Sequence, residues 1–283
     1  MSEFLNVLQP QAVWIGGLLG LILGSFLNVV IHRMPLIMER QWQQDAASHE
    51  AEVTSHPPHF NLATPSSHCP QCKHRLAWWE NLPILSFLLL KGRCHACHAH
   101  IGWRYPAIEL FTSLALAACF QHWGLSFQAV SWSGFVCTLL ALAMIDWDTT
   151  FLPDQLTQPL TWSGLIVAAL GLSGLSLSDA LWGAVAGYLS LWLVYWLFKL
   201  LTGKDGMGYG DFKLFAALGA WFGWSALTPL ILLASLAGIA VGLVLKSRQT
   251  LREQHYIPFG PFLAMAAGVY MVWGDFFTRL GWA

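Results

Sequence analysis

Long apolar segments alternate with short polar stretches along most of the chain. Eight of these segments approach the about 20 residues that a helix needs to cross a bilayer. They lie at approximately 13–31, 106–123, 129–146, 156–175, 180–201, 212–227, 228–245 and 257–277. The sixth is short and lies close to the seventh. The pattern predicts an all-α polytopic membrane protein with about eight transmembrane helices.

The composition also indicates a lipid environment. Of the 283 residues, 56% are hydrophobic and 10% are charged, with a mean hydropathy of +0.53. An average soluble domain has roughly 25% charged residues. The net charge of -1 provides no basic field that would attract nucleic acid, so we expect the lipid bilayer as a partner and no nucleic acid. Because no Lys or Arg precedes Arg33, the first segment lacks the basic region of a secretory signal, and we expect it to remain as a membrane helix.

Basic residues gather in three of the connections between apolar segments, namely after the first, fifth and seventh segments. They are Arg33, Arg40, Lys73, Arg75, Lys91, Arg93 and Arg104, then Lys199, Lys204 and Lys213, and finally Lys246, Arg248 and Arg252. Lys and Arg are retained on the cytoplasmic side of a membrane. Eight helices with both termini outside place all three groups in the cytoplasm, which is the topology we expect.

A polar insert at about residues 32–105 interrupts the apolar pattern, and its first part is too poor in apolar residues to form a core alone. It then carries CPQC at 69–72 and CHAC at 94–97, with 21 residues between the two pairs. This spacing is typical of two zinc knuckles that close one tetrahedral thiolate site. Structural Zn²⁺ is therefore predicted at Cys69, Cys72, Cys94 and Cys97, where ligation would help the insert to fold.

Disulfides or unpaired thiols are the alternative for these four cysteines, but disulfides are uncommon in the predicted cytoplasmic location. A nearby histidine could also replace one thiolate. The candidates are His68, His74, His95, His98 and His100. Cys119 and Cys137 lie within apolar segments and are interpreted as small core residues.

Two aspartates lie at the edges of apolar segments. Asp146 ends the third segment in ALAMIDWDTTFLPD, and Asp211 begins the sixth in GMGYGDFKL, with Asp148 and Asp154 as competitors of Asp146. Ionisable groups at membrane helices are costly and indicate function. In the predicted topology Asp146 and Asp211 share the cytoplasmic membrane boundary, where helix packing could bring them together.

Two carboxyl groups a few Å apart in a partly dehydrated site hold one shared proton near neutral pH. The ionised member takes a proton from water, and the protonated member polarises a peptide carbonyl and then protonates the leaving amine. This is the chemistry of an aspartic protease. Gly206, Gly208 and Gly210 remove side chains and permit positive φ, which gives an extended substrate room beside Asp211. The alternative is a tight turn with an aspartate that caps the next helix.

Several segments together resemble a known family. GMGYGDFKL resembles the GxGD signature of the intramembrane aspartyl proteases, and IDWDTTFLPDQLTQPLTWSGL at 145–165 resembles the segment that carries the other aspartate in type IV prepilin peptidases. GSFLNVVIHRMP at 24–35, ENLPILSFLLLKGRCHAC at 80–97 and RYPAIEL at 104–110 follow the same family in order and spacing. The resemblance covers nearly the whole chain, and the four cysteines are typical of the bifunctional leader peptidase and methyltransferase branch.

The resemblance implies a multi-pass enzyme of the bacterial inner membrane with its active site facing the cytoplasm. Its substrates would be type IV prepilins and the pseudopilins of type II secretion, cleaved after a glycine. The new N-terminal residue, usually phenylalanine, would then be methylated with S-adenosylmethionine. The resemblance assigns the catalytic pair to Asp146 and Asp211, with Gly208 and Gly210 in the active-site loop and Asp146 preferred to Asp148 because it lies seven residues before Pro153.

The methyl-donor site is not visible in the sequence, because no predicted strand leads into a glycine-rich turn of the Rossmann type. The resemblance links methyl transfer to the insert. The polar or flexible positions in its matching segments are Glu80, Asn81, Gly92 and Glu109, for which caps, turns and helix packing are the alternative roles. The sequence therefore assigns no residue to the binding of the donor.

The expected organisation has three parts: a first transmembrane helix at 1–31, the zinc-binding insert at 32–105, and a protease core of about seven helices at 106–283. Two functions from other classes remain as alternatives. An ion-coupled transporter would use both aspartates to bind its ion, but its site would be expected near the bilayer midplane. A scaffold for a secretion machine would use the zinc insert without catalysis.

Overall fold

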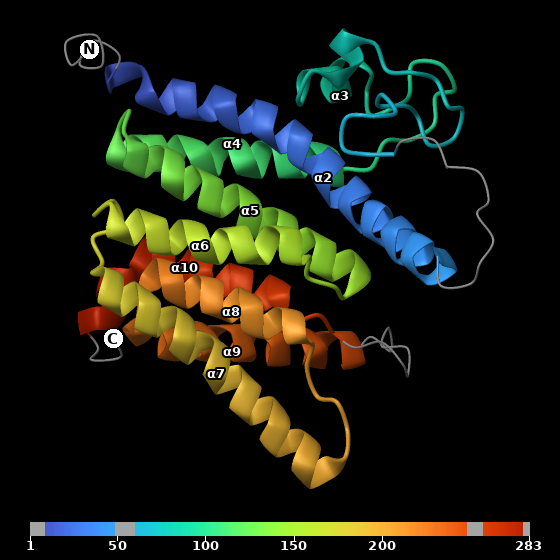
Figure 1. The fold of residues 1–283 in the computed structure, drawn as a ribbon. Helices are drawn as coiled ribbons and strands as arrows, with labels where there is room; N and C mark the ends of the chain where they lie inside the picture. The colour runs from blue at the N-terminus through green and yellow to red at the C-terminus, as the bar shows by residue number, and fades with distance from the viewer. Residues whose placement is uncertain (1–8, 49–59, 248–256, 280–283) are drawn as a thin grey trace. The chain divides into compact units, whose positions relative to one another are not determined.

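The computed structural model describes residues 9–48, 60–247 and 257–279, and these residues fold almost entirely as helices (Figure 1). The longer helices are α2 (Ala12–Ser48), α4 (Arg104–Trp123), α5 (Phe127–Thr149), α6 (Asp154–Ala169), α7 (Leu177–Thr202), α8 (Tyr209–Phe222), α9 (Leu227–Ser247) and α10 (Gly260–Arg279). A short helix, α3 (Leu85–Leu89), lies in the insert. Within the described ranges only two isolated β-bridges occur, and both are in the insert. The prediction of an all-α protein is confirmed.

Each of the eight predicted apolar segments lies mostly within one of the eight longer helices. Four described helical stretches are long and apolar enough to cross a membrane, namely Gln9–Ala46, Phe127–Thr149, Leu177–Thr202 and Trp224–Ser247, and Gly260–Gly274 is a shorter apolar helix. These stretches are typical of a polytopic membrane protein. The count of eight spans stays a prediction.

Two helix boundaries differ from the expected ones. Helix α2 continues to Ser48, well past the expected end at residue 31, because residues 36–48 are mostly good helix formers such as Leu, Met, Gln and Ala. Helix α8 ends at Phe222 rather than at residue 227. The next residue, Gly223, has φ 83°, a conformation that only glycine adopts at little cost and that stops the helix.

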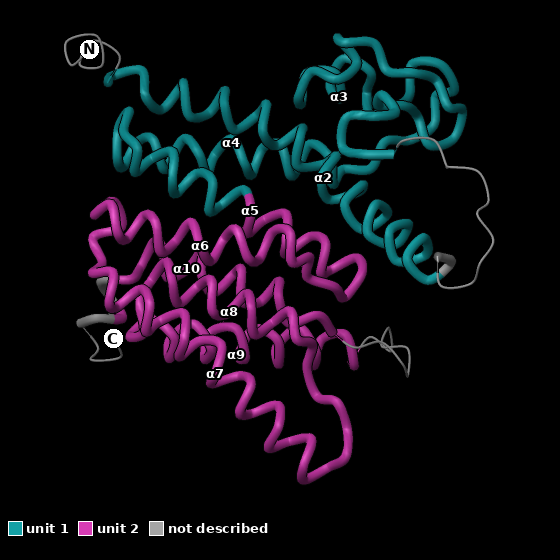
Figure 2. Tube along the Cα trace, in the orientation of Figure 1, with its two compact units in different colours: residues 1–137 teal, residues 138–283 magenta. Residues whose placement is uncertain are grey.

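The chain divides into two compact units, residues 1–137 and 138–283, and each is described by itself (Figure 2). In the first unit α2 packs along α4 through glycines of the segment GGLLGLILGS. A Cβ atom on Gly20 would lie 2.5 Å from the Cα of Ser113. Small residues thus allow the two backbones to approach closely.

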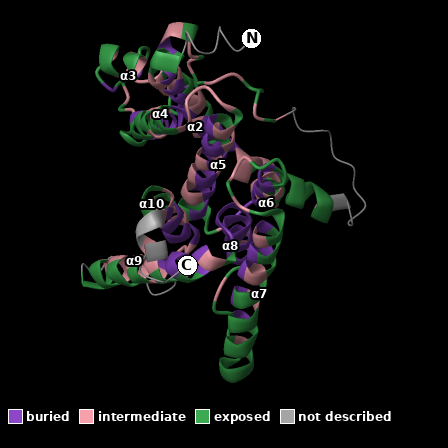
Figure 3. Cartoon of the chain, turned by 90° about the vertical axis from the view of Figure 1, so that its left-hand side faces the viewer, coloured by how far each residue is buried: buried purple, intermediate pink, exposed green. Residues whose placement is uncertain are grey.

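In the second unit α8 is the central helix, and nearly all of its side chains from Asp211 to Phe222 are buried (Figure 3). Helices α6 and α7 both pack against it. Trp221 donates from Nε1 to the carbonyl oxygen of Leu160 on α6 over 2.8 Å, and a Cβ on Gly187 of α7 would lie 2.7 Å from the carbonyl oxygen of Phe215. A helix that is apolar all round belongs in an interior. The packing of α8 against α6 and α7 therefore fixes the position of its first turn, which contains Asp211.

Large apolar side chains remain exposed along α7 and α9. Examples are Leu193, Leu197, Leu236 and Leu243, each about 60% exposed. Exposed leucines in such numbers are unfavourable in water and suit contact with lipid chains. The composition argument for a membrane protein is therefore supported by where these side chains lie.

Candidate functional site

Asp146 lies near the C-terminal end of α5 and is buried, with 4% of its surface exposed. Its Oδ2 atom accepts a hydrogen bond of 2.9 Å from the backbone N–H of Gly260, the first residue of α10. The first N–H groups of a helix have no partner within the helix, so one of them is available for this carboxylate. A Cβ on Gly260 would lie 2.6 Å from the same oxygen, which leaves no room for a side chain. The sequence analysis did not identify Gly260. The only local pattern that sets it apart is its position between prolines in PFGP at 258–261.

Asp211 lies in the first turn of α8 and is 8% exposed. The charge of Asp146 acts on Asp211, so the two buried carboxyl groups lie within electrostatic range of each other. Leu152 joins the two sides of the site, because a Cβ on Gly210 would lie 2.7 Å from its Cβ and a Cβ on Gly260 would lie 3.4 Å from its Cδ1. The structure thus brings together the two aspartates that the sequence singled out.

The glycine-rich loop before Asp211 lets its backbone lie close to neighbouring side chains. Gly206, Gly208 and Gly210 are absent from the described glycines with positive φ, so the structure uses their lack of a side chain rather than the positive φ that they permit. Gly208 precedes α8 in extended conformation, with φ -77° and ψ 146°, and its carbonyl accepts from the N–H of Asp211. Gly208 is therefore the residue at the N-cap, and its backbone N–H donates to the carboxyl group of Asp211, so the alternative of an aspartate that caps the next helix is present in the first turn of α8. The missing side chains at 208 and 210 leave the carboxyl group of Asp211 and Leu152 close to the backbone.

The competing aspartates have different surroundings. Asp148 is exposed at the end of α5. Asp154, the first residue of α6, is paired with Lys213 of α8, whose Nζ atom lies 2.7 Å from both carboxylate oxygens. Neither aspartate is buried as Asp146 is. The pair Asp154–Lys213 also ties the first turn of α8 to the start of α6, two residues away from Asp211.

A second polar contact holds the segment that leads into the loop. Asp205 accepts a hydrogen bond of 2.6 Å from the hydroxyl of Tyr195 and lies 2.8 Å from Nζ of Lys199. The hydrogen bond from Lys199, and then that from Tyr195, keeps the pKa of Asp205 below its usual value. Asp205 is thus ionised at neutral pH and anchors the chain between the end of α7 and Gly206.

The four cysteines of the insert form one cluster. The Sγ atoms of Cys69 and Cys97 are 3.8 Å apart, those of Cys72 and Cys94 are 3.9 Å apart, and all four sulfurs lie within 4.8 Å of one another. Zn–S bonds of about 2.3 Å in a tetrahedron imply sulfur separations of about 3.8 Å. The cluster therefore fits a tetrahedral metal, and the described cysteines are all free thiols, so the disulfide alternative is wrong.

The two C-x-x-C turns have matching backbones. In one, the N–H of Lys73 bonds to the carbonyl of Cys69, and in the other the N–H of His98 bonds to the carbonyl of Cys94. Lys73 has φ 61° and His98 has φ 57°. The backbone N–H of Cys72, followed by that of Gln71, lowers the pKa of Cys69 from 9.0 to about 6, whereas burial and the neighbouring thiols raise the pKa of Cys72, so Cys69 ionises before Cys72.

Glu80 fastens the turn Trp78–Asn81 to the first knuckle. Its Oε2 atom accepts 2.6 Å from the N–H of Ala77 and lies 3.2 Å from Nε2 of His74, while Oε1 lies 3.8 Å from Nδ1 of His95. The Ala77 hydrogen bond, more than the one from His74, lowers the pKa of Glu80. The capping role that the sequence left open for Glu80 is therefore present.

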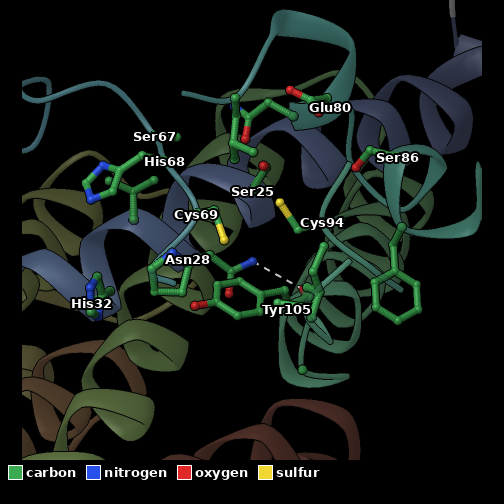
Figure 4. A pocket seen from close by; sticks show the side chains of 18 of the residues that line it. Ser25, Asn28, His32, Ser67, His68, Cys69, Glu80, Ser86, Cys94 and Tyr105 are labelled. Atoms are coloured by element: carbon green, nitrogen blue, oxygen red, sulfur yellow. Dashed lines mark hydrogen bonds between the residues drawn. The ribbon is translucent and has the colours of Figure 1, made fainter. Parts of the chain in front are cut away.

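A cavity of about 680 Å³ lies among α2, the start of α4 and the insert (Figure 4). Glu80, Asn81 and Glu109 all line it. Gly92 does not line the cavity but lies next to Phe87, which does. A Cβ atom on Gly92 would lie 3.0 Å from the ring of Phe87. Asn28 lines the cavity and donates a hydrogen bond of 3.2 Å from its side-chain amide to the backbone carbonyl oxygen of Tyr105. The positions that the sequence linked to methyl transfer thus meet at one cavity.

These features define a polytopic helical membrane protein with a buried aspartate pair and a four-cysteine site. Residues 18–123 match the model of the bacterial peptidase A24 N-terminal domain, and residues 133–243 match that of the type IV leader peptidase family. The chain belongs to the type IV leader peptidase family.

Relatives named prepilin leader peptidase/N-methyltransferase align with the chain over most of its length. The protein from Stutzerimonas stutzeri is 52% identical over 262 residues, which cover 92% of this chain and 90% of that protein. The one from Pseudomonas aeruginosa is 50% identical over 93% of this chain and 90% of its own, and the one from Aeromonas hydrophila is 49% identical over 93% and 91%. No solved structure matches the chain. These relatives are named as enzymes, so the comparisons do not favour a transporter or a scaffold.

Proposed function

We propose that this protein is a membrane aspartic endopeptidase that removes the leader from type IV prepilins and type II secretion pseudopilins, and then methylates the new N-terminus. The observation that carries the peptidase is the burial of Asp146 and Asp211 at the ends of α5 and α8, where the charge of one acts on the other. The names of its relatives support both activities.

In the proposed mechanism, Asp146 and Asp211 share one proton, because two adjacent buried carboxyl groups do not both ionise. The ionised member takes a proton from the attacking water, and the protonated member polarises the scissile carbonyl and then protonates the leaving amine. The Gly260 N–H orients Asp146, and the first turn of α8 orients Asp211. The glycine loop at 206–210 leaves space for an extended peptide beside the pair.

The proposed location is the bacterial inner membrane, with the site facing the cytoplasm. The basic residues between the apolar segments support this orientation. A prepilin carries a basic leader and an apolar helix, so its cleavage site would lie at the membrane boundary where α5 ends and α8 begins.

Zinc is the metal that we propose for Cys69, Cys72, Cys94 and Cys97, because four thiolates in a tetrahedron are typical of a structural Zn²⁺ site. Bound there, the metal would supply folding energy to the insert rather than take part in a reaction step. S-adenosylmethionine is the proposed methyl donor. Methyl transfer to a free amine depends mainly on the alignment of donor and amine, so a binding site that orients both is the main requirement.

The test is mass spectrometry of a co-expressed prepilin in membranes that contain the wild type, Asp146→Asn, Asp211→Asn or Asp148→Asn. Asn keeps the size and polarity of the side chain and removes the titratable proton. We expect the leader to stay attached with Asp146→Asn and Asp211→Asn, and to be removed by the wild type and by Asp148→Asn. Cleavage by both of the first two variants would exclude the aspartic peptidase.

A further inference from the structure

The cavity between α2, α4 and the insert is built as a site for a small charged molecule. Its volume of about 680 Å³ falls within the roughly 300–1,000 Å³ of small-molecule sites. Residues far apart in the sequence surround it, and Figure 4 shows Ser25 and Asn28 from α2 facing Tyr105 of α4 and Cys69 and Cys94 of the insert. All of these residues belong to the first compact unit.

The lining of the cavity includes a carboxyl group that is not paired with a cation in the described part of the chain. Glu109 of α4 is 9% exposed, and it accepts a hydrogen bond of 2.8 Å from the backbone N–H of Ile84 and another from the side chain of Ser25. Both donors are neutral. A carboxyl group buried without a positive partner is costly to ionise, and a cationic ligand would remove this cost. Glu109 is therefore suited to a ligand with a positive charge.

Another part of the lining holds a guanidinium group without an anion. Arg33 of α2 is 7% exposed, and its Nη1 atom donates to the backbone carbonyls of Asn61 and Leu62, each over 3.2 Å. Among the described residues no carboxylate is paired with Arg33. Because arginine stays charged at any ordinary pH, an anionic group in the cavity would supply the missing partner.

Glu109 and Arg33 lie beside different parts of α2. Ser25, which touches Glu109, precedes Arg33 by eight residues, a rise of about 12 Å at 1.5 Å per residue. The ligand that satisfies both must therefore carry a cation and an anion some distance apart. The lining also includes Asn28 and Tyr105, and the ring of Phe87 elsewhere in the wall offers a surface for a flat apolar group, whereas the ring of Phe60 already contacts the guanidinium group of Arg40.

We propose that this cavity is the binding site of S-adenosylmethionine, with Glu109 facing its sulfonium and Arg33 binding the carboxylate of its amino-acid part. This assignment rests on the methyl transfer of the proposed function. The donor has the required cation and anion, and its adenine ring needs an apolar surface. The site also lies against the four-cysteine cluster, whose Cys69 and Cys94 are part of the lining, so the metal site would shape the wall of the donor site.

The positive charge of the sulfonium allows a test of the role proposed for Glu109. S-adenosylhomocysteine keeps the adenosine and amino-acid parts and has an uncharged sulfur. Binding of both compounds to the purified full-length protein in detergent is measured by equilibrium dialysis, for the wild type, Glu109→Gln, Arg33→Gln and the control Glu39→Gln. Glu39 is an exposed carboxylate of α2 outside the cavity lining.

Glu109→Gln is expected to weaken S-adenosylmethionine binding about tenfold and S-adenosylhomocysteine binding less than about twofold, since bonds to charged groups contribute a factor of this size. Arg33→Gln is expected to weaken both compounds by a similar factor, and Glu39→Gln neither. Equal loss of both compounds in Glu109→Gln, or wild-type affinity in both cavity variants, would overturn the assignment. Failure of the wild type to bind the donor would instead contradict the methyl transfer itself.

Leader cleavage by the same preparations checks that the unit that holds Asp146 and Asp211 is intact, and metal bound at the four cysteines, measured by atomic emission, checks that the unit that holds Glu109 and Arg33 is folded. A second measurement needs no variant. Photochemical cross-linking of radiolabelled S-adenosylmethionine to the wild type, followed by peptide mapping, is expected to label peptides from residues 25–36 or 67–109. Label confined to residues 138–283 would exclude the cavity.

Discussion

The backbone N–H of Gly260 donates a hydrogen bond to the Oδ2 atom of Asp146 over 2.9 Å and so joins residues 114 positions apart. The contact depends on the absence of a side chain, since a Cβ on Gly260 would lie 2.6 Å from that oxygen. The start of α10 is thus part of the aspartate site.

Gly260→Ala is therefore predicted to displace the Asp146 carboxyl group and to lower the rate of leader cleavage about tenfold or more, because small misplacements of a reacting group are costly. Gly268→Ala is the matched control, since a Cβ on this residue of the same helix meets nothing within 4 Å. Cleavage rates are compared by mass spectrometry of a prepilin at equal enzyme amounts. Equal rates for both variants would show that the Gly260 contact does not matter for catalysis.

The ion pair between Asp154 and Lys213 is predicted to position the first turn of α8. Its loss should therefore lower the cleavage rate more than the thermal stability of the protein. Its side chains are 48% and 33% exposed, and exposed pairs contribute at most about 1 kcal/mol. Asp154→Asn and Lys213→Met should each lower cleavage several-fold with little change in thermal stability, and the double variant should be no worse than either single one. Lys204→Met, in an exposed loop position, is the control. Additive losses in the double variant would mean that the two side chains act separately.

Glu80 is predicted to give the insert a dependence on pH in the acid range. Its pKa is lowered from 4.5 by the N–H of Ala77 and by His74, so the ionised form is favoured in the folded state. Such a group contributes stability that is fully present above pH 4.5 and is lost as the pH falls through the lower folded pKa. Glu80→Gln should lower stability by about 1 kcal/mol at pH 6, since charged acceptors bind more strongly than neutral ones.

The difference between the wild type and Glu80→Gln should shrink as the pH falls below 4.5. It can be followed by hydrogen exchange of residues 77–80 in the chelator-treated protein, which removes the separate effect of protons on metal binding. A difference that stays constant between pH 6 and pH 3 would show that the charge of Glu80 is not involved.

Removal of the metal is predicted to affect donor binding more than peptide cleavage. Cys69 and Cys94 line the cavity, whereas Asp146 and Asp211 belong to the other compact unit. Cys72→Ser/Cys97→Ser should lose the bound metal, measured by atomic emission, and bind S-adenosylmethionine at least tenfold more weakly, while cleavage falls less. Cys119→Ser, a buried cysteine outside the cluster, controls for loss of a thiol. Unchanged donor affinity without metal would separate the metal site from the cavity.

Much of the fold follows from patterns that are local in the sequence. Apolar segments predicted the longer helices because a helix that faces lipid or a core must be apolar over its own length. The two C-x-x-C turns predicted the cysteine cluster because ligand spacing within each turn is fixed by a few backbone bonds. The ends of α2 and α8 were harder to predict, since helix formers continue past Pro35 and a single glycine with positive φ ends α8 at Phe222.

The sequence by itself determined the chemical groups of this protein, namely a helical membrane chain, two candidate aspartates beside a glycine-rich loop, and four thiols. Only the tertiary structure decided which groups meet. The Gly260–Asp146 contact, the Asp154–Lys213 pair and the cavity with Glu109 and Arg33 join residues that are distant in sequence. Such contacts depend on how helices pack, and the sequence of one segment carries no record of the partner that packing will place beside it.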